Sequence, residues 1–249
     1  MIDFATLPRD DLQAMAEAAR EAMTCQRVLA KTGDTIVGEL LRGAGTFYEW
    51  RHYPPGDVYD AEYHAQYYYH AHPEAERPSG EHGHFHTFLR PLGMPPGVRP
   101  VPGQDVQLDG ENEALSHLVG IAMNRAGLPV RLFTTNRWVT GEAWYAAADV
   151  VRMLDHFIVD HARPSWPVNR WICAVVRLFR PQIVKLLAAR DTEVGRRAEG
   201  RDLEAVLEDR ALEVVSEMPV SIEEQIACVD LALRGRRVTV LPEVSGLSR

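Results

Sequence analysis

Histidines that alternate with other residues along two short segments constrain this chain more than any other feature of its sequence. The chain has ten histidines, and most of them lie in one short stretch. His70 and His72 are two residues apart, and so are successive members of the group His82, His84 and His86. Because side chains alternate across a β-strand, residues two apart share one face at a spacing of about 7 Å. If both segments are strands, each presents a row of imidazoles on one face.

The two segments, residues 66–72 and 82–89, are predicted to be neighbouring antiparallel strands. Both are rich in residues that suit a pleated, half-buried surface, and Pro73, Pro78 and Gly80 between them favour a turn. If the two rows share a face, up to five neutral imidazoles converge, and three or four nitrogen ligands suit zinc or a non-haem iron or copper site. We therefore predict one transition metal ion (zinc, iron or copper) bound by a subset of His70, His72, His82, His84 and His86.

Two nearby residues are candidate catalytic groups beside such a metal. Glu81 directly precedes the second histidine row and can act as a ligand, as a partner that fixes a histidine tautomer, or as a general base. Tyr68 shares the parity of His70 and can donate a proton or bind substrate, although cross-strand packing explains a tyrosine there equally well. The alternative to a metal site is a wet polar cavity whose histidines and tyrosines hold an organic ligand.

The rest of the chain indicates an α+β fold in a single domain over residues 1–249. An amphipathic helix is predicted over 9–30 and an antiparallel β-rich core over 46–136. A helical layer is predicted over 142–234, so that strands are followed by helices, as in α+β proteins. The loop 91–110, rich in proline and glycine, is expected to roof the site.

Several local expectations follow from the same patterns. The first strand is expected at 46–53, ended by Pro54, because proline lacks the N–H that a central strand needs. A second hairpin is expected from the two apolar runs 117–123 and 130–135, and His117 can add a ligand from across the sheet. The expected late helices are 168–189, bent at Pro181, then 202–217 and 222–234.

Composition excludes several classes of function. A net charge of -8 disfavours a general nucleic-acid binder, because phosphate affinity comes mainly from clustered Lys and Arg. No apolar run is long enough for a membrane span, and the acidic start lacks the features of a signal peptide, so a cytoplasmic protein is expected. Motifs typical of NTPases, dinucleotide-binding proteins, serine hydrolases and zincins do not occur.

Four segments resemble an uncharacterised bacterial family known as a domain of unknown function. They are 52–58 (HYPPGDV), 66–72 (QYYYHAH), 81–88 (EHGHFHTF) and 166–171 (WPVNRW), so the resemblance spans most of the chain and implies no established chemistry. A shorter resemblance is to the H-x-H-x-x-x-E metal strand of the cupins, through His70, His72 and Glu76. It covers fewer than ten residues, Pro73 interrupts it, and no second cupin motif follows, so it implies no fold or role.

The function favoured by these patterns is that of a metal-dependent enzyme acting on a small molecule, as an oxidoreductase or as a hydrolase or lyase. Oxidisable rings such as Tyr68 and Trp50 near the site favour redox chemistry slightly. Arg90, Arg99 or Arg131 can capture an anionic substrate by bidentate pairing. The competing interpretations are a non-catalytic metal- or small-ligand-binding protein and a structural or partner-binding protein. An enzyme needs an open coordination position at the metal, whereas a structural site is closed.

Overall fold

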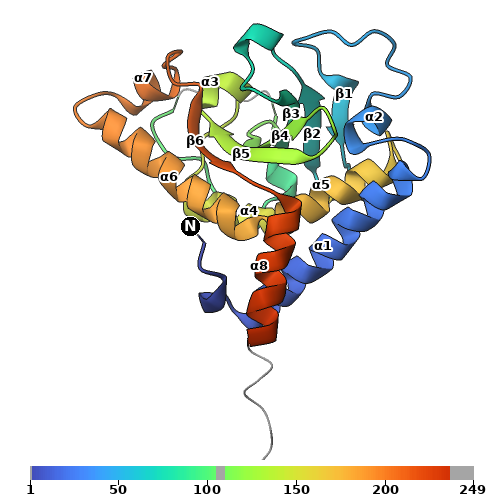
Figure 1. Cartoon of the computed structure of the whole chain (residues 1–249). Coiled ribbons are helices and arrows are strands. Elements are labelled where there is room, and N and C mark those ends of the chain that lie inside the picture. Colours follow the sequence, from blue (N-terminus) through green and yellow to red (C-terminus); the bar gives the residue numbers. More distant parts are fainter. Residues whose placement is uncertain (1, 105–109, 236–249) are drawn as a thin grey trace, which may run out of the picture.

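The protein is built on one antiparallel sheet with helices on its flanks, and the sequence prediction of an α+β fold is confirmed (Figure 1). The computed structural model describes residues 2–104 and 110–235. Its six strands follow one another in sequence order across the sheet, and every neighbouring pair is antiparallel. The strands are β1 (Tyr53–Tyr59), β2 (Ala65–His70), β3 (Glu81–Leu89), β4 (Ser116–Asn124), β5 (Pro129–Thr135) and β6 (Val214–Pro219).

The helices come from both ends of the chain and from the connections between strands. The α-helices are α1 (Arg9–Ala30), α2 (Ile36–Leu40), α3 (Arg137–Thr140), α4 (Ala147–Met153), α5 (Trp166–Leu178), α6 (Arg180–Ala198), α7 (Leu203–Leu207) and α8 (Ile222–Gly235). Short 3-10 turns lie at Phe4–Thr6, Glu74–Glu76, Pro91–Gly93 and Leu154–His156. None of the helices in the described ranges is both long enough and apolar enough to cross a membrane.

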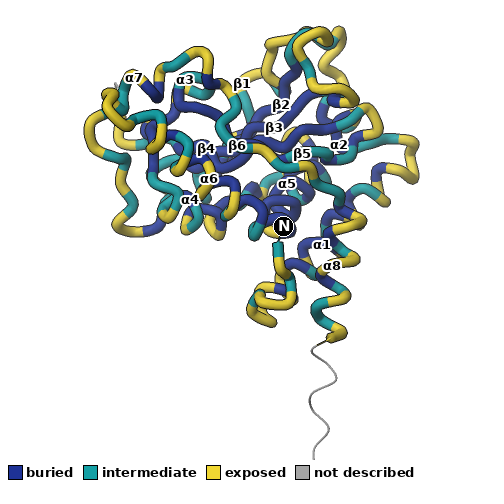
Figure 2. The backbone as a smooth tube through the Cα atoms, turned by 60° about the vertical axis from the view of Figure 1, so that its left-hand side comes forward, coloured by how far each residue is buried: buried dark blue, intermediate teal, exposed yellow. Residues whose placement is uncertain are grey.

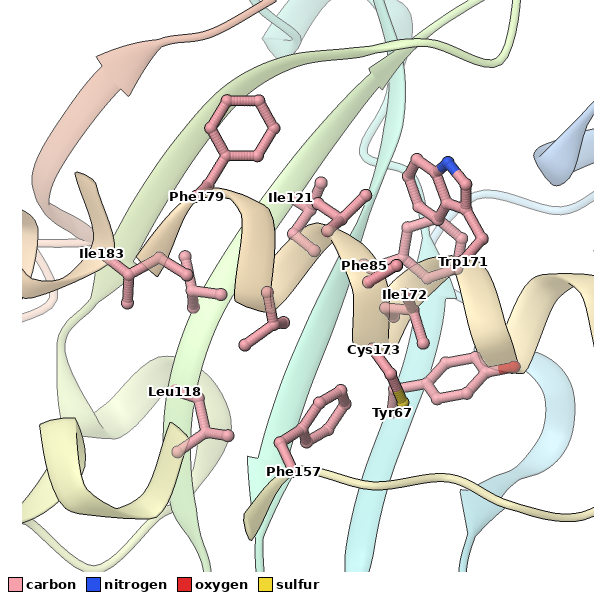
Figure 3. Packing of buried hydrophobic residues seen from close by; sticks show 14 of the residues in the cluster. Tyr67, Phe85, Leu118, Ile121, Phe157, Trp171, Ile172, Cys173, Phe179 and Ile183 are labelled. Atoms are coloured by element: carbon pink, nitrogen blue, oxygen red, sulfur yellow. The ribbon is translucent and has the colours of Figure 1, made fainter. Parts of the chain in front are cut away.

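The main core lies between one face of the sheet and helix α5. Phe85 of β3 packs against Trp171 of α5 with ring centroids 6.0 Å apart, and against Tyr67 of β2 with ring centroids 5.9 Å apart (Figure 3). Helix α1 packs along α5, and the strands β2 to β5 run through the buried centre of the molecule (Figure 2). The face of β2 and β3 opposite to α5 therefore remains available for the polar residues of the histidine segments.

The 166–171 segment that resembles the family has a structural role in this core. The Tyr67 hydroxyl donates a hydrogen bond to Asn169 Oδ1 at 2.5 Å, and Asn169 Nδ2 donates to the carbonyl oxygens of His161 and Arg163. Asn169 is fully buried and so connects β2, α5 and the loop before α5. A buried amide with all three of these bonds explains an asparagine here without any catalytic role.

The first strand lies later in the chain than the sequence predicts. Residues 46–52 form no strand, and β1 runs from Tyr53 through Pro54 and Pro55 to Tyr59. The pairing with β2 is irregular between Tyr53 and Val58, so the prolines occupy a bulged stretch at the edge of the sheet. Proline is tolerated there because an edge strand or bulge needs fewer backbone N–H donors than a central strand.

A helix predicted over 202–217 is replaced by a short helix and a strand. Helix α7 ends at Leu207, and Val214–Pro219 forms β6, which pairs with β5. The free edge of β5 supplies a hydrogen-bonding partner that local sequence patterns do not reveal, and β-branched residues such as Val214 and Val215 suit a strand. This correction matters for the site, because it brings Glu213 and Val214 beside the histidine strands.

Candidate metal centre

The register of β2 and β3 brings two of the predicted ligands directly opposite each other. His70 pairs with His84, and Tyr68 pairs with His86. The Nε2 atoms of His70 and His84 lie 2.7 Å apart, and both side chains are buried. His72 follows the end of β2, and its ring centroid lies 5.1 Å from that of His70 and 5.2 Å from that of His84.

These three residues, His70, His72 and His84, form a cluster that we call the histidine triad. One ring nitrogen of each lies within 4.8 Å of the others, which is close enough for all three to hold one metal ion after a small adjustment. Two nitrogen ligands of a tetrahedral zinc ion lie about 3.3 Å apart, so the His70 and His84 rings would separate by about half an ångström. The spacing of the triad therefore fits a transition metal.

Glu81 fixes the orientation of His84 from the side away from the triad. His84 Nδ1 lies 3.1 Å from Glu81 Oε1, and Arg131 donates to Glu81 Oε2 at 2.8 Å. Burial opposes ionisation of Glu81, but the hydrogen bonds from His84 and Arg131 outweigh it and lower the pKa of the carboxyl group. The ionised carboxylate holds the proton of neutral His84 on Nδ1, which leaves the Nε2 lone pair directed into the triad.

Burial keeps the His70 and His84 imidazoles neutral. Desolvation, with the neighbouring imidazoles His84, His72 and His52, lowers the pKa of His70 to about 2. Burial also lowers the pKa of His84, against the opposing effect of Glu81. A neutral imidazole has one unprotonated ring nitrogen, which is the form that binds metal. His70 and His84 therefore each keep an unprotonated ring nitrogen at neutral pH.

His86 lies beside the triad and forms a second buried pair with His117 of β4. The His86 and His84 ring centroids are 4.9 Å apart, and His86 Nδ1 lies 3.1 Å from His117 Nε2. His117 Nδ1 lies 3.3 Å from the Thr135 hydroxyl, and burial lowers the pKa of His117 to about 3. The structure thus places His117 behind His86, where it contacts His86 and Thr135.

The structure does not bring His82 into this cluster. The Tyr69 hydroxyl lies 2.6 Å from His82 Nδ1, and the His82 ring packs near Phe47. The pairing of β3 with β4 shifts between Glu81 and Gly83, and a bulge of this kind reverses the alternation of side chains. Glu81 therefore faces His84, whereas His82 lies on the Tyr69 side of the sheet.

Gly83 was the available signal for this bulge. A Cβ atom at Gly83 would lie 2.5 Å from the His70 carbonyl oxygen and 2.7 Å from the Tyr69 hydroxyl. Only glycine allows β2 and β3 to approach so closely at this point. An isolated glycine inside a predicted strand often marks a bulge, so side chains need not alternate strictly between the two faces through Gly83.

Tyr68, the second candidate catalytic residue, lies on the same side as His70. Its ring stacks on His52 with centroids 3.6 Å apart and meets the His70 ring edge-on at 5.4 Å. Burial, with smaller contributions from Asp57 and Glu142, raises the pKa of the Tyr68 hydroxyl. Tyr68 therefore stays protonated at neutral pH and can act as a donor rather than as a base.

A cavity of about 370 Å³ adjoins the triad. His72, His84 and His86 line one side of it, together with Glu81. The remaining lining residues come from the 76–78 turn, from β5 and α3, and from the segment around β6: Glu76, Arg77, Pro78, Arg131, Phe133, Thr135, Val139, Ala211, Glu213, Val214 and Glu217. A molecule in this cavity would reach two of the three triad rings.

The loop 91–110 does not roof this cavity in the part that the structure describes. None of its described residues is among those that line the cavity. Val101 instead donates its N–H to the Trp144 carbonyl, and the Pro96 carbonyl accepts a bond from Arg152, so the loop packs against the helical layer. Residues 105–109 of the expected roof lie outside the described residues.

A family model with the description "Domain of unknown function (DUF6969)" matches residues 16–220. The match covers most of the chain, so the chain belongs to this family, as the four sequence segments predict. No curated protein and no solved structure matches the chain. The chemistry of the site therefore has to be inferred from its own residues.

Proposed function

We propose that this DUF6969 family member binds one transition metal ion through His70, His72 and His84 and is a metal-dependent enzyme acting on a small molecule. The observation that carries the proposal is the opposition of the His70 and His84 Nε2 atoms at 2.7 Å, with the Glu81 carboxylate behind His84. At 2.7 Å these two atoms share a hydrogen bond, and because Glu81 holds the His84 proton on Nδ1, neutral His70 donates from Nε2. A metal ion bound to both Nε2 atoms would require the His70 proton to move to Nδ1, and His72 would supply the third ligand nitrogen.

The cavity beside the triad supports an enzyme rather than a closed structural site. Catalytic metals usually keep a coordination position for water or substrate, whereas structural sites use four protein ligands. A three-histidine set next to a cavity of about 370 Å³ leaves room for such a position. His86 and Glu81 border the same space and can bind or orient a substrate.

We propose a small-molecule substrate without assigning it a charge. Arg131 donates to both Glu81 and Glu217, and Arg90 donates to Gln66 and to the Asn112 carbonyl. Both guanidinium groups thus have partners within the protein. The anionic substrate that the sequence suggests gains no support from them, and the proposal is limited to a small molecule that fits the cavity.

We further propose that the bound metal is iron or copper and that it supports redox chemistry. Trp50 stacks on His72 with ring centroids 4.3 Å apart, and Tyr68 meets His70 edge-on at 5.4 Å. Oxidisable rings thus contact two of the three proposed ligands, which favours iron or copper over zinc. Oxygen uptake by iron(II)- or copper-loaded protein with a panel of small metabolites tests this choice, and a protein that holds only zinc and consumes no oxygen would favour hydrolase or lyase chemistry.

Elemental analysis of untagged protein tests the metal site. It compares the wild type with two variants in which a histidine on either side of the sheet is replaced by alanine. We expect wild-type protein to hold one zinc, iron or copper ion per chain after reconstitution. His84→Ala should lose the ion, and His82→Ala should retain it, because His82 lies on the other side of the sheet. Equal metal contents in the two variants, or no bound metal in the wild type, would overturn the proposal.

A non-catalytic metal-binding protein is the competing function. The number of protein ligands at the occupied metal separates the two classes. X-ray absorption spectroscopy of the metal-loaded protein should find three imidazole nitrogens and at least one further light-atom ligand that small anions displace. A site closed by four protein ligands and insensitive to added azide or cyanide would favour storage or structural binding.

A further inference from the structure

His72 is the triad member with the weakest protein support. It lies beyond the end of β2, whereas His70 and His84 are held by the strand register. Its Nδ1 lies 3.9 Å from Glu213 Oε1, which is too long for a hydrogen bond. His84, by contrast, has the Glu81 carboxylate at hydrogen-bond distance. Something other than a carboxylate must therefore hold the His72 ring in place.

The Trp50 side chain stacks on the His72 ring. The two rings are nearly parallel, with an interplanar angle of 26° and centroids 4.3 Å apart. The Trp50 ring also meets the His70 ring edge-on at 6.5 Å. Yet Trp50 itself is 56% exposed, so it gains little from burial in the core. Core packing therefore does not account for the position of the Trp50 ring against the histidine cluster.

The backbone of Trp50 adds an independent observation. Trp50 has a φ angle of 66°, in the left-handed region that bulky residues rarely adopt. Its N–H donates to the Ala71 carbonyl oxygen at 2.8 Å, so the strained residue is bonded to the peptide between His70 and His72. Strained backbone of this kind clusters at functional sites, where the surrounding structure holds it. Both the backbone and the ring of Trp50 thus contact the His70–Ala71–His72 segment.

We infer that Trp50 is the positioning residue for His72, and that its indole sets the orientation of the His72 ring. The stack fixes the plane of the imidazole while the backbone bond to Ala71 fixes the distance between the segments. This inference rests on the proposed metal site. Trp50 itself binds no metal and contacts no substrate in this role.

The test compares metal affinity with stability in three variants of Trp50. Zinc affinity is measured by competition with a chromophoric chelator, and stability by thermal unfolding of the metal-free protein. Trp50→Ala should lower zinc affinity by about 10- to 100-fold, the usual effect of removing a group that orients a ligand. Trp50→Phe keeps a ring over His72 and should restore most of the affinity.

Trp50→Gly separates positioning from a structural role. Glycine accepts a positive φ without strain, so this variant should be more heat-stable than Trp50→Ala while its zinc affinity is at least as low. If Trp50 acted only on stability, zinc affinity would increase with thermal stability. Trp50→Gly would then bind zinc more tightly than Trp50→Ala. Wild-type zinc affinity in both Trp50→Ala and Trp50→Gly would overturn the inference.

The same experiments separate this inference from the proposed function. If His84→Ala loses zinc and the Trp50 variants do not, the metal site stands and the role of Trp50 falls. If wild-type protein and His84→Ala bind zinc equally weakly, the metal site itself fails. Copper(II) gives a direct readout of proximity, because an ion on His72 should quench Trp50 fluorescence. The quenched component should disappear in Trp50→Phe, and identical quenching in that variant would contradict the contact.

Discussion

The Glu81 carboxylate lies 3.1 Å from His84 Nδ1, directly behind the nitrogen that faces His70. Both side chains are buried, and Arg131 compensates the charge of the carboxylate. A carboxylate–histidine pair of this kind is common behind metal ligands, because it fixes the tautomer and raises the basicity of the ligand nitrogen. The Glu81–His84 pair determines which nitrogen of His84 carries the proton. A hydrogen bond between two imidazoles alone would not determine this.

Replacing Glu81 by glutamine tests this relationship. Glu81→Gln keeps the shape but removes the charge that stabilises the Nδ1 proton of His84, so zinc affinity should fall by about 10- to 100-fold. The half-buried Arg131 also loses an ion-pair partner, and stability should fall by roughly 1–3 kcal/mol. Glu217→Gln is the matched control, because Glu217 pairs with the same arginine but its side chain is 59% exposed. Equal zinc affinities in the two variants would contradict the role of Glu81.

The buried histidines should make the metal-free protein sensitive to acid. Burial lowers the pKa of His117 to about 3, below the value near 6.5 of an unfolded histidine. The unfolded chain therefore binds protons that the folded protein excludes, so stability is lost as pH falls below about 6.5 towards 3. Each such histidine contributes a slope of about 1.4 kcal/mol per pH unit. Urea unfolding between pH 7 and 5 should show a smaller slope in His117→Gln than in the wild type, and equal slopes would contradict a neutral buried His117.

Glu142 should have the opposite effect at higher pH. Burial raises the pKa of its carboxyl group to about 8, although Arg190 and the His117 N–H oppose the shift. The folded protein keeps this proton while the unfolded chain releases it near pH 4.5, so stability falls as pH rises from about 4.5 to 8. Glu142→Gln, which needs no proton, should lose less stability than the wild type between pH 6 and 8. A wild-type slope in this variant would show that Glu142 is ionised in the fold.

The sequence predicted the α+β class, the antiparallel pairing of the two histidine segments and the convergence of His70 and His84. These features depend on local alternation and on the turn residues between adjacent strands. Two features depend on distant partners and were therefore missed. Strand β6 forms only because the edge of β5 is free to pair with it, and the cavity wall that contains Glu213 follows from that pairing.

The side on which His82 lies depends on one close approach between strands. Strand alternation assigns each side chain to a face from its position in the sequence. A bulge adds one residue to a strand and reverses the faces beyond it, while the pattern of residue types stays the same. The same shift that turns His82 away brings Glu81 beside His84, whereas strict alternation places His82 and not Glu81 on the face of His84. Gly83 is the position on which both outcomes depend.

Gly83→Ala tests whether this close approach holds the triad together. The new methyl group would lie 2.5 Å from the His70 carbonyl oxygen, and because that atom belongs to the backbone the two strands must separate. Stability should fall by roughly 1–3 kcal/mol, as for other overpacked sites. Zinc affinity should fall as well, because the His70–His84 pairing lies at the same point of the hairpin. Gly195→Ala in α6 is the control: a methyl group there meets no atom within 4 Å, and alanine should raise stability by roughly 0.5–1 kcal/mol in a helix. Urea unfolding and zinc competition measure both effects. Wild-type stability and affinity in Gly83→Ala would show that the hairpin has room for a side chain, and that the bulge does not set the geometry of the triad.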